Sequence, residues 1–379
     1  MRKTLLLTLI ILVITGLIVG YVFLKKSAEL TPITPADTEL SIQDVILEDP
    51  LAPIEQSPTD PLQLITNDSV AGYWINSLDN QVYYATTDGS IKRTGATIDT
   101  AQTITSTKVL GSVREVVPTT RGEAALIISG TQQAPDFKIY DVEHQTWRAL
   151  PSGTAAAAWG PTDDPLEIVY LKSEVEKTGL VTTSLNIYNH VKGSSRFVDQ
   201  LELIDVRLTW PTTNLIYISN LPDVTAQPVW AYDLKKKTFR EIVAPKAGLW
   251  MRWFGGGVGL GFDLTTGLYR LSPEATPSQW LPINTTPDKC LISDSSAYCA
   301  ATEGIALNSA RSLENYLLQR NSYSDDITKI NEAGESLIVF SSKEKGVSFD
   351  ITNLSKHDDS LYFINRYDQR LYSLALRSN

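Results

Sequence analysis

Cys290 and Cys299 give the sharpest local signal for chemistry in this chain of 379 residues, because they are its only cysteines. The residues between them form two strand-like ends around the polar turn Asp294-Ser295. Nine residues apart about that centre, the two thiols face each other across adjacent strands, within reach of a disulfide. Two buried thiols of a cytosolic protein are the alternative. No metal site is expected, since two cysteines without a nearby His leave zinc short of ligands.

Two pairs of neighbouring carboxylates, Asp163-Asp164 and Asp325-Asp326, have the residue type that glycosidic chemistry uses. Each pair is adjacent in sequence within a predicted turn, so neither defines a separation across a pocket. No nucleophile elbow, phosphate loop, metalloprotease or calcium-loop motif occurs. We therefore expect no catalytic residue, no cofactor and no metal.

The chain has only three histidines. His144 and His190 fall in turns before outer strands, where a solvated surface position is expected. His357 precedes Asp358-Asp359 in another turn; a solvated turn is favoured there over a weak cation site.

The glycine-rich run Gly255–Gly261 resembles a nucleotide-binding loop only superficially. Leu260 stands where the third glycine of that motif is needed, and no helix follows to present its N-terminus to a phosphate. The run is predicted to be a flexible hairpin.

The aromatic residues offer the main candidates for binding, because Tyr and Trp bury a large area with few rotors and keep a polar tip. The chain has 8 Trp and 16 Tyr. Trp250, Trp253 and Phe254 cluster at the start of one repeat and are candidate binding residues. The alternative is that they fill space between packed sheets.

A single helical segment is predicted over Asn308–Arg320, with Asn or Ser as its N-cap. Its face would carry Leu313, Tyr316, Leu317 and Arg320. Tyr316 and Arg320 are candidate binding residues if this segment overhangs a channel mouth. The alternative is a helix that packs on the ends of the strands.

These residues must be positioned by a repeat that occurs seven times. Each copy has a short run of β-formers, a polar turn, and a strand beginning with an aliphatic residue that Tyr usually follows. The spacing between copies, 48, 48, 44, 37, 59 and 44 residues, suits one four-stranded blade per copy. The strand starts are Ile91, Ile139, Ile187, Ala231, Leu268, Ile327 and Leu371.

The predicted fold is an all-β, seven-bladed β-propeller over residues 62–379, with six or eight blades as the alternatives. The chain ends after the third strand of the last copy, near Leu376. We expect an early segment, Leu62 to Thr66, to supply the missing outer strand and close the ring, which removes an exposed sheet edge.

The blade openings resemble those of TolB-like and WD40-like propellers. Trp210-Pro-Thr-Thr-Asn-Leu-Ile-Tyr-Ile-Ser is similar to their Trp-Ser-Pro-Asp-Gly…Ile-Ala-Tyr-Val opening. The likeness covers about residues 65–377, but most copies lack the Asp-Gly, and the Gly-His and Trp-Asp pairs of WD40 repeats are absent. The whole arrangement resembles membrane-anchored propellers of bacterial surfaces. The resemblance implies a fold and transfers no functional residue.

Residues 1–26 are predicted to be an N-terminal transmembrane anchor. Residues 4–24 carry no charge and would span about 31 Å as a helix, the thickness of a bilayer core. A cleaved signal peptide is the alternative, but its apolar core is shorter, roughly 7–15 residues. Residues 27–61 contain six Pro and eight acidic residues without Lys or Arg, which indicates an acidic spacer.

The formal net charge of −10 argues against nucleic-acid binding. The acidic flank beyond the anchor and the paired cysteines favour a C-terminal domain outside the cytoplasm. The leading hypothesis is a membrane-tethered, non-enzymatic propeller that binds a cell-envelope protein or polysaccharide. An extracytoplasmic hydrolase or lyase with acidic residues around the central channel, and a scaffold subunit of an envelope complex, are the alternatives.

Overall fold

The computed structural model describes residues 61–94, 102–103, 111–161, 166–175, 180–254, 257–293, 295–304, 306–321 and 323–376. They belong to one compact unit, Ile54–Asn379. The predicted anchor and the spacer up to residue 60 lie outside these ranges, as does the pair Asp163-Asp164. Within the described ranges, no helix is long and apolar enough to cross a membrane.

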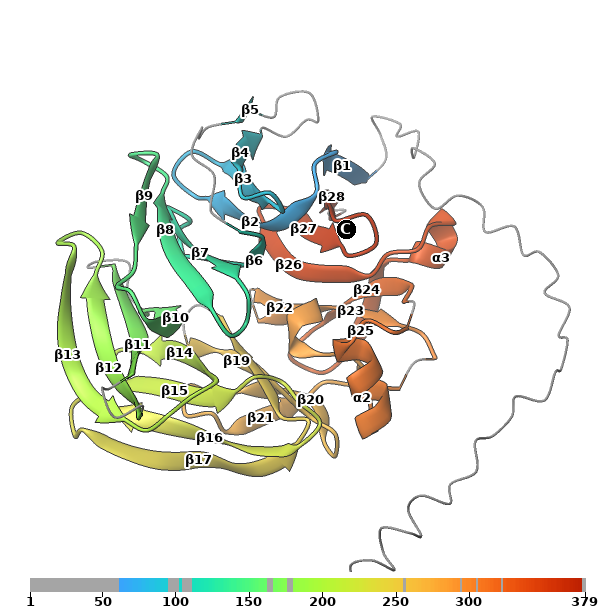
Figure 1. Ribbon diagram of the computed structural model, residues 1–379. Coiled ribbons are helices and arrows are strands. Elements are labelled where there is room, and N and C mark those ends of the chain that lie inside the picture. Colours follow the sequence, from blue (N-terminus) through green and yellow to red (C-terminus); the bar gives the residue numbers. More distant parts are fainter. Residues whose placement is uncertain are drawn as a thin grey trace, which may run out of the picture. The chain divides into compact units, whose positions relative to one another are not determined.

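The described residues form seven four-stranded antiparallel sheets, which confirms the seven-bladed all-β propeller (Figure 1). Blades 1 to 3 are β2 (Val70–Asn76), β3 (Gln81–Thr86), β4 (Ile91–Thr94) and β5 (Gln102–Thr103); β6 (Val113–Pro118), β7 (Ala124–Gly130), β8 (Pro135–Asp141) and β9 (Thr146–Ala149); and β10 (Thr154–Trp159), β11 (Glu167–Val175), β12 (Val181–Asn189) and β13 (Ser194–Leu201). Blades 4 to 6 are β14 (Val206–Thr212), β15 (Leu215–Asn220), β16 (Ala226–Asp233) and β17 (Thr238–Ala247); β18 (Trp250–Trp253), β19 (Gly259–Asp263), β20 (Gly267–Leu271) and β21 (Pro277–Trp280); and β22 (Cys290–Ser293), β23 (Ser296–Thr302), β24 (Asp325–Ile330) and β25 (Ser336–Phe340).

Blade 7 joins the two ends of the propeller. Its sheet runs in the order β26 (Ile351–His357), β27 (Ser360–Asn365), β28 (Arg370–Ala375) and β1 (Leu62–Thr66). The antiparallel pairing of β1 with β28 begins with Leu62 opposite Leu374. The first strand of the propeller therefore completes its last sheet, which confirms the predicted closing strand Leu62 to Thr66.

The repeated aliphatic-Tyr pair lies in the third strand of its blade and points into the core. Ile139 and Tyr140 are fully buried. Ile91 begins β4 as predicted, but in the other six blades the third strand begins earlier than predicted. In blade 2, β8 begins at Pro135, so Ile139 is its fifth residue. Asp136 and Lys138 are polar, so no apolar run in the sequence marks the first positions of β8.

The apolar core lies between neighbouring blades. One cluster joins Trp74 and Tyr83 of blade 1 to Ile127 and Tyr140 of blade 2. Trp74 and Tyr83 stack with ring centroids 5.7 Å apart. A single blade could not cover either face of its sheet, so each blade depends on its neighbours for burial.

Three short helices interrupt the strands in the described residues: the 3-10 helix η3 (Pro287–Lys289), α2 (Ala310–Leu317) and α3 (Ser342–Lys345). The prediction of a single helix is therefore wrong. α2 begins after its N-cap Ser309, whose side chain accepts a hydrogen bond from Ser312 N. It ends at Leu317 rather than Arg320, because Gln319 adopts a left-handed conformation with φ 53°.

Successive strands of a blade are antiparallel, so their connections alternate between two faces of the propeller. One face carries the connections between blades and those between the second and third strands. η3, α2 and α3 all lie in such connections, and we call this face the α2 face. The first strand of each blade begins there and lies closest to the axis.

Candidate functional site

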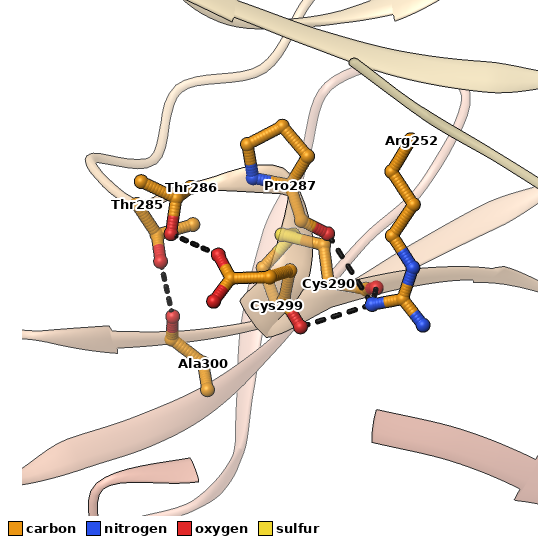
Figure 2. The surroundings of a disulfide bond; sticks show 8 residues. Arg252, Thr285, Thr286, Pro287, Cys290, Cys299 and Ala300 are labelled. Atoms are coloured by element: carbon orange, nitrogen blue, oxygen red, sulfur yellow. Dashed lines mark hydrogen bonds between the residues drawn. A yellow bond between two sulfur atoms is a disulfide. The ribbon is translucent and has the colours of Figure 1, made fainter. Parts of the chain in front are cut away.

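Arg252 lies in β18, the innermost strand of blade 5. Its Nη1 donates hydrogen bonds to three backbone carbonyl oxygens, those of Asp288 at 2.9 Å, Cys290 at 3.1 Å and Pro287 at 3.5 Å. Figure 2 shows this nitrogen against the carbonyls of Pro287 and Cys290, with the other terminal nitrogen directed away from them. No acceptor among the described residues meets Nε or Nη2, and the side chain is only partly buried.

A disulfide fixes the segment that supplies these carbonyls. Cys290 and Cys299 are directly opposite each other in the pairing of β22 with β23, and their sulfur atoms are bonded (Figure 2). The predicted pairing is therefore confirmed. Thr285 Oγ1 donates to Ala300 O at 2.6 Å, which attaches the residues before η3 to β23. The acceptors of Arg252 are thus held by covalent and hydrogen bonds.

Arg207 and Glu115 form an ion pair between two blades that are separated by blade 3. Arg207 Nη2 donates to Glu115 Oε1 at 2.8 Å, although β14 and β6 belong to blades 4 and 2, which are not neighbours. Their side chains remain 35% and 45% exposed, so solvent reaches them. Both residues lie near the start of innermost strands, which places the pair at the channel mouth on the α2 face.

The charge of Arg252 interacts with this pair and with the phenol of Tyr73 in blade 1. Burial lowers the pKa of Arg252, and the Asp288 carboxylate opposes that effect. Burial also raises the pKa of Tyr73, whose hydroxyl donates to Tyr362 O at 2.6 Å. We call Arg252, Arg207, Glu115 and Tyr73 the channel-mouth cluster.

A second group of charges lies deeper, between blades 6 and 7. Lys289 Nζ is 2.5 Å from Asp325 Oδ2 and 2.8 Å from Asp350 Oδ1, and all three side chains are buried. Burial alone would lower the pKa of Lys289, but the two carboxylates raise it. Arg366 donates through Nε to Asp350 Oδ2 at 2.8 Å. We call Lys289, Asp325, Asp350 and Arg366 the buried ion network.

Tyr316 connects this network to the channel mouth. Its hydroxyl donates to Asp288 Oδ2 at 2.6 Å, and burial raises the pKa of the phenol. The ring lies beneath two cations, 5.5 Å from Lys289 Nζ and 5.1 Å from Arg366 Cζ. Tyr316 is only 1% exposed, so its aromatic face is already occupied by the protein.

A small pocket opens beside the channel mouth between blades 4 and 5. Its cavity volume is about 10 Å³, which is room for about one water molecule. Its lining residues include Arg207, Asn220, Gln227, Trp250 and Met251. The pocket can take a single chemical group rather than a whole ligand.

The α2 face also carries exposed apolar side chains. Among the described residues, six of the large exposed hydrophobic residues lie in its connections or at the strand ends beside them, two lie in connections of the opposite face, and five lie on outer strands. Val175 and Val181 are opposite each other at the end of the long β11–β12 hairpin. The six are Val175, Leu180, Val181, Ile204, Leu318 and Tyr367, and the two are Leu78 and Val191.

Of the predicted aromatic residues, Phe254 packs on Arg252, while Trp250 and Trp253 pack on tyrosine rings. Phe254 lies under the Arg252 guanidinium, with the ring centroid 5.1 Å from Cζ. Trp253 packs on Tyr217 with ring centroids 5.0 Å apart, and Trp250 lies 6.3 Å from Tyr316. All three side chains are partly buried in apolar clusters between blades. This is the arrangement expected if they fill space between packed sheets.

Arg320 is exposed beyond the end of α2, so the prediction that it shares the face of Leu313 and Tyr316 is wrong. Leu313 and Tyr316 are buried, which supports the packing role of this helix. Asp325 is not a turn carboxylate but a fully buried member of the ion network, while Asp326 accepts a hydrogen bond from Ser342 N at 2.8 Å.

His144 is exposed, as predicted, but His190 is buried, and the prediction of a solvated position is wrong. Its Nε2 lies 3.5 Å from Asp141 Oδ2, and burial lowers the pKa of its imidazole. Its ring meets Trp159 edge-on with centroids 6.3 Å apart. Arg148 of blade 2 also donates a hydrogen bond to the His190 carbonyl oxygen.

The glycine-rich run serves packing in its described part, residues 257–261. A Cβ on Gly259 would lie 2.7 Å from the Trp253 ring, and one on Gly261 would lie 2.3 Å from the Tyr269 ring. These glycines let two aromatic rings lie flat against β19. No phosphate-binding role is needed to explain them.

Sequence reasoning missed Arg207, Arg252 and Glu115 as a group. Each is a charged residue within an innermost strand that is otherwise mostly apolar, and this position is a signal once the strand order is known. The sequence does not show that three separate blades bring these residues to one place.

The fold is shared with known propellers, although no protein family and no curated protein matches the sequence. An oligogalacturonate lyase from Vibrio parahaemolyticus has a TM-score of 0.55 and 12% identity, covering 83% of this chain and 92% of that one. The propeller domain of the Trilobed protease from Pyrococcus furiosus has a TM-score of 0.52 and 10% identity, with coverages of 83% and 94%. The WD40 repeats of RRP9 have a TM-score of 0.52 and 9% identity, with coverages of 83% and 97%. At these identities the likeness establishes the fold alone: the chain is a seven-bladed β-propeller.

Proposed function

We propose that this protein is a non-catalytic binding module and that its α2 face recognises a protein of the cell envelope. The exposed apolar residues carry this proposal, because among the described residues six lie on the α2 face and two on the opposite face, while the other five lie on outer strands. Exposed apolar side chains around a polar centre are typical of protein-binding surfaces. Polysaccharide recognition has less support, since the clustered aromatic rings are occupied by contacts within the protein.

We also propose that the propeller lies outside the cytoplasm, tethered by a single-pass anchor at residues 4–24. The Cys290–Cys299 disulfide supports an oxidising compartment. The uncharged N-terminal run supports the tether. A scaffolding role within an envelope complex is compatible with the same surface.

Site-specific photo-crosslinking in native cells tests the proposed surface. A photoreactive residue at Val181 or Leu318, on the α2 face, should give a crosslinked protein product. The same residue at Leu78 or Val191 is the matched control, because both are at least 70% exposed on the opposite face. Products from the control positions alone, or from no position, would contradict the proposal.

An extracytoplasmic hydrolase or lyase is the second candidate, because Glu115, Arg207 and Arg252 converge from three blades at the channel mouth. A carboxylate beside cations is an arrangement that acid–base chemistry uses. Incubating the full chain and its Glu115→Gln variant with a panel of glycans distinguishes the two functions. Degradation by the wild type that Glu115→Gln abolishes would replace binding with catalysis.

A further inference from the structure

Arg252 presents an unused hydrogen-bonding edge at the channel mouth. Its Nη1 donates to three carbonyl oxygens, including those of Pro287 and Cys290 in Figure 2. Nε and Nη2 meet no acceptor among the described residues. Nε and Nη2 form the two-pronged edge of a guanidinium that matches the two oxygens of a carboxylate. The Phe254 ring packs against the guanidinium plane of Arg252, and the three carbonyl oxygens hold its Nη1, so the orientation of this edge is fixed.

The neighbouring charges leave Arg252 without a carboxylate partner among the described residues. Glu115 is paired with Arg207 at 2.8 Å. The Asp288 carboxylate accepts hydrogen bonds from Tyr316 and from Thr286. Among the described residues Arg252 therefore donates its hydrogen bonds to backbone carbonyl oxygens alone, and the charges of Asp288 and Glu115 act on it without a direct ion pair.

We infer that Arg252 anchors a carboxylate of the partner protein, carried by an acidic side chain or a chain end that enters the channel mouth from the α2 face. This inference rests on the proposed function and names the chemistry of the same site. The exposed apolar residues of the α2 face then contact the rest of the partner segment.

A hexaglutamate peptide carrying a fluorescent label is the direct probe, with hexaglutamine as its neutral counterpart. Fluorescence anisotropy with the full chain in detergent should show binding of hexaglutamate that weakens with salt, and no binding of hexaglutamine. Oligogalacturonate supplies the carboxylate from a sugar instead. If it binds more tightly than the peptide, or if hexaglutamate does not bind, the inference of a peptide carboxylate is overturned.

Three substitutions locate the binding group. Arg252→Gln should weaken hexaglutamate binding by about tenfold or more, since a hydrogen bond between charged groups is lost. Arg196→Gln changes the net charge equally at an exposed position of the outer strand β13 and should leave binding unchanged. Glu115→Gln removes the negative charge near Arg252 and should tighten binding. An unchanged affinity in Arg252→Gln, or a weaker one in Glu115→Gln, overturns the inference.

Arg252→Gln also loses three internal hydrogen bonds, so its thermal unfolding must be compared with that of the wild type. If this variant does not fold, Glu115→Gln alone decides the result, because its side chain is 45% exposed and its removal leaves no buried group unpaired. The crosslink from Val181 separates this inference from the proposed function. A crosslink that persists unchanged in Arg252→Gln overturns the anchor and leaves the surface in place, whereas no crosslink in the wild type overturns the surface itself.

Discussion

Lys289 Nζ lies 2.5 Å from Asp325 Oδ2, and the two side chains are 2% and 0% exposed. Lys289 comes from the connection that enters blade 6, and Asp325 from the third strand of that blade. Asp325 Oδ2 also accepts a hydrogen bond from Ile351 N at 2.8 Å, at the start of blade 7. The pair therefore joins two consecutive blades at the α2 face.

Lys289→Met should be strongly destabilising, because it leaves Asp325 and Asp350 buried without their shared cation. Removing one partner of a buried ion pair costs roughly 3–5 kcal/mol. Lys236→Met is the matched control, since Lys236 is 78% exposed and 3.8 Å from Asp233. Its effect should be at most about 1 kcal/mol. Urea denaturation measures both, and equal effects would show that the network does not stabilise the fold.

The Cys290–Cys299 disulfide should contribute about 2–3 kcal/mol, because it closes a short loop. Cys290→Ala with Cys299→Ala should lower the unfolding free energy by that amount without changing the circular dichroism spectrum. Trapping of thiols with an alkylating agent during lysis of native cells tests the compartment. Free thiols in the native protein, or a melting temperature that a reducing agent leaves unchanged, would contradict the extracytoplasmic assignment.

The propeller should lose stability above about pH 10. Burial raises the pKa of Tyr140 and of Tyr217 to about 12 from the ordinary value of 10.0. In the unfolded chain these phenols ionise from pH 10 upwards, whereas in the folded protein they stay protonated to about pH 12. The unfolded state then binds fewer protons, so the unfolding free energy falls with rising pH in this interval.

Denaturant titrations at pH 8, 10 and 11 measure this loss. Tyr140→Phe should reduce it, and should cost little at pH 8, because the buried Tyr140 hydroxyl has no hydrogen-bond partner. An identical pH dependence in the wild type and in Tyr140→Phe would rule out Tyr140 as a contributor.

Gly261→Ala should destabilise blade 5 by roughly 1–3 kcal/mol, the usual cost of overpacking a core. The added Cβ would lie 2.3 Å from the Tyr269 ring on the neighbouring strand. In the background of Tyr269→Leu, the same substitution should cost less, since the ring that it meets is gone. A double-mutant cycle measures this coupling, and equal costs in both backgrounds would exclude the ring contact as the cause.

The likeness between blades explains why much of the fold could be predicted. The aliphatic-Tyr pair marks a buried position in the third strand of most copies, and its spacing measures one blade. The closing strand Leu62 to Thr66 followed from counting, because the last copy lacks its fourth strand. The strand start before Ile139 was misplaced, since Asp136 and Lys138 are polar residues that are extended through the pairing of β8 with β7 of the same sheet.

Candidate site residues were harder to predict, because their burial depends on other blades. His190 lies in a turn, so the sequence predicts a solvated position, but the Trp159 ring packs on it and the Arg148 side chain donates to its carbonyl oxygen. The sequence likewise predicts that Asp325 lies in an acidic turn, because Asp326 follows it. It is buried because Lys289, 36 residues earlier, reaches it across the end of the sheet.

The sequence by itself determined the repeat, the all-β class, the seven blades, the closing strand and the disulfide. These features depend on residues close together in the chain or on counting its copies. Only the tertiary structure decided that Glu115, Arg207 and Arg252 meet at one channel mouth and that the edge of Arg252 has no acceptor within the part of the chain that the structure describes. Closing the ring sets the distances between blades, and no local pattern of residues encodes those distances.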